Sequence, residues 1–175
     1  ESLHPYTGLT VATKGGMLRP GPNHWANDGR PASLRAAVEA SLKVLGVERL
    51  DLWQLHRVDP AVPADDQFAA IAEMQRAGLI HHAGLSEVSI EQIDAAGKHF
   101  RVATVQNGYH LIERKNEPVL EYCERAGIPF IAYFPLATGA LAAADSILGP
   151  IAGKLGITPA QAALAWLLHR SPVLV

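Results

Sequence analysis

The feature that most constrains the fold is one pattern that occurs five times along the chain. In each case a short apolar run ends in a polar residue, a loop follows, and a stretch with helical spacing comes next. The apolar runs lie at residues 10–16, 50–56, 80–88, 102–110 and 128–137. Strands that alternate with helices in this way are typical of βαβ units and a parallel sheet. We therefore expect an α/β protein.

Start and stop signals place helices between these strands. The segment SLRAAVEASLKVLG (33–46) has Ser33 at the position of an N-cap and a glycine at its end. A second helix is expected over residues 65–77, and Ser89 with Gln92 forms a capping-box pattern at the start of a third. Further helices are expected near residues 117–126 and, twice, after residue 137.

Residues 16–31, GMLRPGPNHWANDGRP, form the only long loop that we expect. A loop of this length without secondary structure is uncommon unless it is functional or mobile. It follows the first strand, at the end where α/β folds build their sites. A complete eightfold β/α barrel takes about 250 residues. Five units in 175 residues are therefore either a barrel lacking some strands or an open sheet.

Composition excludes several classes of function. With 15 basic and 17 acidic residues the net charge is -2, which gives no electrostatic basis for nucleic-acid binding. The longest apolar run, residues 162–168, is too short for a membrane span. A single cysteine, Cys123, excludes an internal disulfide and is compatible with a cytoplasmic location. The histidines show no metal-ligand spacing, so no metal is expected, and the oligomeric state stays open.

Polar residues stand at the carboxyl end of every expected strand. They are Lys14, His56, Ser86 with Glu87, Gln106 with Asn107, and Tyr133. In parallel α/β folds the ligand meets the carboxyl ends of the strands, so side chains that arrive there converge on one pocket. Each residue alone has an ordinary explanation, such as a core histidine bonded to a carbonyl. Their recurrence on five strands favours a binding site.

Six segments then resemble, in order and spacing, successive segments of a bacterial aldo/keto reductase. They are VATKGG, DLWQLHRVDP, GLSEVSIEQI, TVQNGYHLIER, AYFPLATGAL and TPAQAALAWLLHRSP. The resemblance runs from about Leu9 to the C-terminus. It implies a partial (β/α)8 TIM barrel of roughly units three to seven, forming one domain over residues 1–175. It also implies that NADP(H) is bound in extended form without a Gly-rich loop, and no such loop is present in the sequence.

The implied activity is reduction of a small aldehyde or ketone by hydride transfer from the nicotinamide, with a proton supplied by a tyrosine. By this resemblance Lys14 favours the ionised form of that phenol, and His56 hydrogen-bonds the substrate carbonyl. Ser86 and Gln106 correspond to residues that hold the nicotinamide carboxamide, and Tyr133 to the aromatic residue that stacks on the ring.

The remaining cofactor residues follow from the same resemblance. The residues expected along the pyrophosphate are Phe134, Pro135, Leu136 and Ala137. Glu87 stands where many members carry asparagine after the serine. The family's aspartate and catalytic tyrosine would precede Glu1. The last strand and the basic residues that grip the 2′-phosphate would follow Val175.

Two other functions fit part of this pattern. One is a regulatory subunit of the same fold that binds a nicotinamide nucleotide without turnover, which leaves His56 without a carbonyl to face. The other is an unrelated barrel lyase that uses Lys14 to form a Schiff base. The lyase leaves Gln106 and Tyr133 unexplained.

We predict that the 175-residue chain by itself does not reduce a carbonyl, because Lys14 and His56 have no phenol to assist. The measurement is NADPH oxidation by the purified chain in the presence of aldehydes and ketones. Robust turnover would contradict the prediction.

Overall fold

Five parallel strands form the main sheet of the computed structural model, which describes residues 4–175. The strands are β1 (Ala12–Gly15), β4 (Leu50–Leu55), β5 (Ile80–Ser86), β6 (Val102–Gly108) and β7 (Phe130–Tyr133). Their order in the sheet is β1-β4-β5-β6-β7, the order in which they occur along the chain. This is the arrangement of a partial (β/α)8 barrel, and the five expected β/α units are confirmed.

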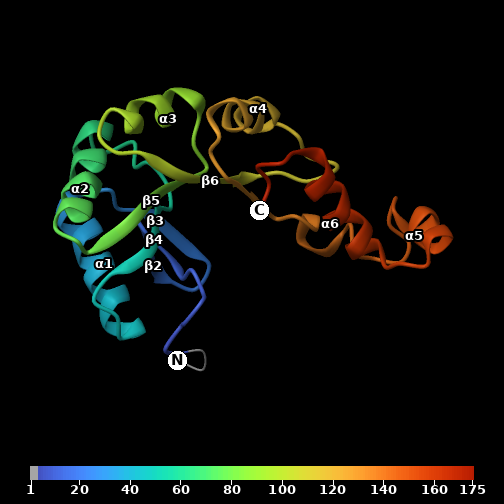
Figure 1. Ribbon diagram of the computed structural model, residues 1–175, viewed down its shortest axis with the longest axis horizontal. Helices are drawn as coiled ribbons and strands as arrows, with labels where there is room; N and C mark the ends of the chain where they lie inside the picture. The colour runs from blue at the N-terminus through green and yellow to red at the C-terminus, as the bar shows by residue number, and fades with distance from the viewer. Residues whose placement is uncertain (1–3) are drawn as a thin grey trace. The chain divides into compact units, whose positions relative to one another are not determined.

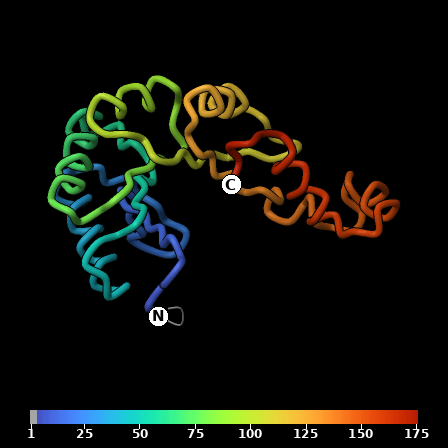
Figure 2. The backbone as a smooth tube through the Cα atoms, in the orientation of Figure 1, coloured from blue at the N-terminus to red at the C-terminus, as the bar shows by residue number. Residues whose placement is uncertain are grey.

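A helix follows each strand of the sheet, after a hairpin in the case of β1, and α1 to α4 each precede the next strand of the sheet (Figures 1 and 2). The helices are α1 (Pro31–Leu45), α2 (Ala64–Arg76), α3 (Ile90–Gly97), α4 (Glu117–Ala126), α5 (Gly149–Leu155) and α6 (Pro159–Arg170), and a 3-10 turn, η1, covers Ala137–Gly139. The capping box of Ser89 and Gln92 at the start of α3 is confirmed.

The expected N-cap of the first helix is wrong. The helix begins at Pro31, with Arg30 as the N-cap residue, so Ser33 lies within the first turn. Proline suits this position because its fixed φ is helical and its missing N–H would have no partner there. From there the Ser33 hydroxyl helps Arg30 to lower the pKa of Asp28.

The expected irregular loop is also wrong, because most of residues 16–31 form an antiparallel hairpin. Its strands are β2 (Met17–Gly21) and β3 (His24–Asn27), with Asn23 in the left-handed region at the tip. Across the hairpin the Arg19 guanidinium lies 5.1 Å from the centre of the Trp25 ring. Such a cation–π pair stabilises a short ribbon that has no apolar alternation to indicate it.

The chain divides into two compact units, residues 1–104 and residues 105–175. The expectation of one domain over residues 1–175 stays a prediction.

In the first unit, the side of the sheet that faces the helices is tightly packed. A Cβ atom added at Gly15 would lie 2.6 Å from the Trp53 ring and 2.9 Å from Ala37, so only glycine fits between β1, β4 and α1.

The opposite face of the first unit's sheet carries buried polar groups. The Gln54 amide is almost fully buried and donates to the Thr104 hydroxyl at 3.0 Å. A Cβ atom at Gly84 would collide with that hydroxyl and would lie 3.1 Å from the Gln54 side chain. Glycine at position 84 therefore leaves room for this hydrogen bond across the inner face.

In the second unit, the buried Tyr109 ring joins β6 to α4 and α6. It stacks on Trp166 with ring centres 6.0 Å apart and meets Phe130 edge-on at 6.1 Å. The Tyr109 hydroxyl donates to Glu117 at 2.7 Å. Burial and the neighbouring Glu117 carboxylate both raise the pKa of the phenol.

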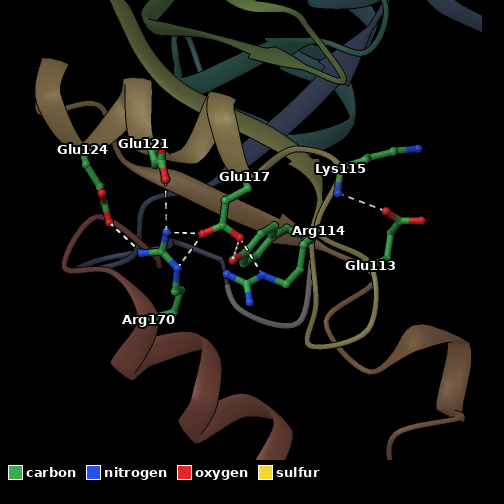
Figure 3. Close-up of polar contacts among 8 residues, drawn as sticks. Glu113, Arg114, Lys115, Glu117, Glu121, Glu124 and Arg170 are labelled. Carbon is green, nitrogen blue, oxygen red and sulfur yellow. Dashed lines mark hydrogen bonds and ion pairs between the residues drawn. The ribbon is translucent and has the colours of Figure 1, made fainter.

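Glu117 is also the centre of an ion cluster that fastens α6 to α4 (Figure 3). It accepts from Arg114 at 2.6 Å and from Arg170, whose guanidinium also pairs with Glu124 at 3.3 Å. Chiefly because of the hydrogen bond from Arg114, the pKa of Glu117 falls to about 2. A carboxylate only 19% exposed is thus kept ionised by two arginines and a phenol.

Within the part of the chain that the structure describes, no single helix is long and apolar enough to cross a membrane. α5 and α6, which meet at a bend of 90°, reach that length and composition only when taken together.

We predict that Glu117→Gln destabilises the protein by about 1–3 kcal/mol, since charge-assisted hydrogen bonds to Arg114 and Arg170 are lost. The folded-state pKa of Glu117 is depressed, so its contribution is complete above the ordinary value of 4.5 and disappears as the pH falls toward about 2. Urea unfolding of both proteins between neutral and acid pH measures this, and their difference should shrink on acidification.

The matched control is Glu121→Gln, because that carboxylate is half exposed and 4.0 Å from Arg170. A loss of stability as large as that of Glu117→Gln would mean that general charge balance, and not the cluster around Glu117, holds α4 and α6 together.

Candidate active site

The register of three neighbouring strands of the main sheet, β1, β4 and β5, puts three of the predicted residues on one face of that sheet. Lys14 is paired with Gln54 of β4, and Gln54 with Gly84 of β5. His56 lies two residues beyond Gln54, and Ser86 two residues beyond Gly84. Since side chains alternate along a strand, Lys14, His56 and Ser86 come from the inner face that Gln54 also occupies.

His56 directly follows β4 and is held there by its backbone. Its N–H donates to the Gly15 carbonyl at 2.8 Å, which fastens the end of β4 to the end of β1. The pKa of the half-buried imidazole is lowered, first by burial and then by the positive charges of Arg57 and Lys14. At neutral pH the ring is therefore uncharged and offers both a donor and an acceptor nitrogen.

Lys14 is the penultimate residue of β1, and its side chain is exposed as a whole. Partial desolvation of its ammonium nevertheless lowers its pKa. The amine stays a cation at neutral pH, because lysine ordinarily titrates at 10.5. The structure thus combines a fixed positive charge and a neutral imidazole on neighbouring strands.

Ser86 ends β5 and is 4% exposed. Its hydroxyl accepts a long hydrogen bond of 3.4 Å from Arg57, whose same nitrogen donates to the His56 carbonyl at 2.7 Å. The next residue, Glu87, has φ 53°. Non-glycine residues rarely adopt this left-handed conformation, which at a strand end is common near functional sites.

The remaining predicted residues lie in the second unit. On β6 and β7, Gln106 is paired with Ile131, and Gly108 with Tyr133, so Gln106 and Tyr133 share a face. The Tyr133 ring is 36% exposed and stacks on the exposed Phe134 ring with centres 3.9 Å apart.

The chain after Tyr133 turns sharply. Phe134 has φ 57° and Ala137 φ 50°, both in the left-handed region. Leu136 and Ala137 pack against a small apolar core of Leu141, Leu148 and Ala163. Pro135, between Phe134 and Leu136, is half-buried. The predicted pyrophosphate segment is therefore a tight turn whose side chains are partly used for packing.

The structure brings Lys14, His56, Ser86 and Glu87 together at adjacent strand ends of the first unit, and Gln106 and Tyr133 onto one face in the second. Sequence reasoning missed Arg57, and it missed the buried pair of Asp59 and Gln67. A signal for the pair exists. Gln67 stands at helical spacing with Ile71 and Met74, so a polar residue occupies the apolar stripe of α2.

Proteins similar to this chain include two curated relatives. An oxidoreductase of Schizosaccharomyces pombe is 53% identical over 175 residues, covering 100% of this chain and 57% of that protein. Pyridoxine 4-dehydrogenase of Escherichia coli is 38% identical over 179 residues, covering 98% of this chain and 62% of that protein. The chain thus spans about three fifths of the length of these relatives.

Solved structures with the same fold include glycerol dehydrogenase from Gluconobacter oxydans. That structure matches with a TM-score of 0.85 at 28% identity, over 95% of this chain and 62% of the other. An aldo/keto reductase from Klebsiella pneumoniae in complex with NADP and acetate matches with a TM-score of 0.72 at 29% identity, over 91% of this chain and 56% of the other.

The sequence profile of the Aldo/keto reductase family matches residues 2–175. The profile, the strand order and the two sets of relatives agree, and the chain belongs to the aldo/keto reductase family.

Proposed function

We propose that this chain carries part of the active site of an NADP(H)-dependent reductase that acts on a small aldehyde or ketone. The observation that carries the proposal is the placement of Lys14, His56 and Ser86 on one face of three adjacent strands. This face has a fixed cation, a neutral imidazole and a buried hydroxyl. These are the groups that carbonyl reduction needs for charge stabilisation, orientation and cofactor binding.

The donor set suits a nicotinamide. A carboxamide needs both a hydrogen-bond donor and an acceptor, and each unit offers such a group: the Ser86 hydroxyl in the first and the Gln106 amide in the second. In the second unit the exposed Tyr133 ring also suits a planar ring. By the family resemblance, Glu87 in the first unit and the turn of Phe134, Pro135, Leu136 and Ala137 in the second are further candidate cofactor residues. NADP is favoured over NAD by the Klebsiella pneumoniae relative, whose structure holds NADP.

When bound, NADPH supplies the hydride that goes to the carbonyl carbon, while the carbonyl oxygen gains a proton. His56 would donate a hydrogen bond to that oxygen and so fix its direction. Lys14 would stabilise the anionic form of the proton donor, a tyrosine that the family resemblance assigns to a part of the reductase outside these residues. A small polar substrate agrees with the names of two relatives, a pyridoxine and a glycerol dehydrogenase.

We predict that Lys14→Met in the full-length reductase lowers kcat at least about a hundredfold, since the phenol loses the charge that helps it to exchange its proton. NADPH affinity, measured by fluorescence titration, should change little. Lys43→Met, an exposed lysine in the last turn of α1, is the control. If the wild-type reductase reduces no carbonyl, or if Lys14→Met retains full kcat, the proposed function fails.

A second prediction concerns Arg57→Gln. Removing this positive charge should raise the pKa of His56 toward its ordinary value of 6.5, since Arg57 is one cause of the lowering. The acid limb of the pH profile of kcat/KM should therefore move to higher pH. KM for NADPH should rise too, because Ser86 loses its partner. Arg35→Gln, on the exposed face of α1, should leave the pH profile in place.

A further inference from the structure

We propose that Asp59 and Gln67 are positioning residues that hold the loop after His56 against the base of the hairpin after Lys14. This inference rests on the proposed function, because it assigns the pair a task in the same reaction. We call Asp59, Gln67 and the Gly29 amide the Asp59 latch. All three residues are buried and belong to the first unit.

The first part of the latch joins the loop to the hairpin. The Asp59 carboxylate accepts from the Gly29 N–H at 2.9 Å with one oxygen. Its other oxygen accepts from the Ala61 N–H at 2.9 Å, which closes a turn within the loop. A single carboxylate therefore sets the shape of its own loop and bonds to the segment between β3 and α1.

The second part of the latch joins the loop to α2. The Gln67 side-chain oxygen accepts from the Asp59 N–H at 3.0 Å, and its nitrogen donates to the Asp59 carbonyl at 2.9 Å and the Val62 carbonyl at 2.9 Å. Gln67 is 0% exposed, so these bonds replace all of its contact with water. Only an amide side chain supplies this acceptor and these two donors at one position.

Gly29 is required here for space. Its φ is not positive, but a Cβ atom at this position would collide with the Gln67 amide and would lie 2.7 Å from the Asp59 side chain. The absence of a side chain lets the Gly29 backbone approach the carboxylate closely enough to bond to it.

The latch joins a segment that follows Lys14 to the loop that follows His56. Asp59 is three residues after His56, and Gly29 is next to Asp28, whose N–H donates to the Gly16 carbonyl at 3.1 Å, two residues after Lys14. The ends of β1 and β4 are thus tied twice, once by the His56 amide and once through the latch. Two ties restrain the backbone that carries the imidazole more closely than one would.

A purely structural role explains the latch less well. Burying a carboxylate and an amide is costly unless every bond is made, and apolar residues of the same size are often equally stable. Hydrogen bonds have directions, however, and a reacting group must be held within about 0.5 Å of its productive position. The polar latch therefore suits a loop whose position matters for the reaction.

The test uses Asp59→Asn in the full-length reductase. Whichever way the new amide turns, one of its two acceptor sites becomes a donor that faces an N–H group. We expect kcat per folded molecule to fall about tenfold to a hundredfold, with KM for NADPH within about twofold of wild type. The control is Asp66→Asn, which removes the same charge from an exposed position on α2 next to Gln67.

A second readout separates positioning from stability. The titration of His56 is followed by NMR, and its midpoint should rise toward the ordinary 6.5 when the imidazole becomes better hydrated. Removing the negative charge of Asp59 would by itself lower the pKa of His56, so a midpoint that rises reports a ring that has moved. Gln67→Met, which keeps the buried volume, should show the same changes if Asp59→Asn folds poorly.

The outcomes are distinct. If kcat per folded molecule or the His56 midpoint stays at the wild-type value in the latch variants, the latch proposal is overturned, even where the melting temperature falls. If the wild-type reductase itself reduces no carbonyl, the proposed function fails. In that case an unchanged or lowered His56 midpoint still rejects the latch and a raised one supports it.

Discussion

The parallel register of β1, β4 and β5 is the constraint on which the candidate site depends. Pairing Lys14 with Gln54 and Gln54 with Gly84 decides that His56 and Ser86 share a face with the lysine. A slip of one residue in either pair would turn one of these groups toward the helices. The packing on the helix side opposes such a slip, because a residue with a side chain at position 15 would collide with the Trp53 ring.

The repeating strands and helices were predictable because their signals are local. Apolar runs, capping residues and glycine stops each act within a few residues, and the predicted capping box at Ser89 is confirmed. The hairpin in residues 16–31 was not predictable in this way. Its strands pair through their backbones and through the contact of Arg19 with Trp25, and its sequence has neither alternation nor an Asn-Gly turn.

The residues of the candidate site also differ in whether a local sequence signal marks them. Lys14, His56 and Ser86 could be named from the sequence because each ends a strand, and their common face followed once the register was known. Arg57 and Asp59 could not be named from the sequence, because each depends on a partner far away in the chain. The partner of Arg57 is Ser86, and the partner of Asp59 is Gly29. A buried polar residue on an apolar stripe, as with Gln67, is the one sequence signal that such a network leaves.

The charges around His56 explain why a histidine suits this position. Burial and the positive charges of Arg57 and Lys14 all lower the pKa of His56, so each of them opposes protonation of the ring. A carboxylate beside the ring would have the opposite effect and favour an imidazolium at neutral pH. Arg57 therefore has two effects at once: after burial, it helps to lower the pKa of the imidazole, and it bonds to Ser86 on the next strand. One guanidinium thus contributes both to the lowered pKa of the proposed carbonyl-binding group and to the position of a proposed cofactor-binding group.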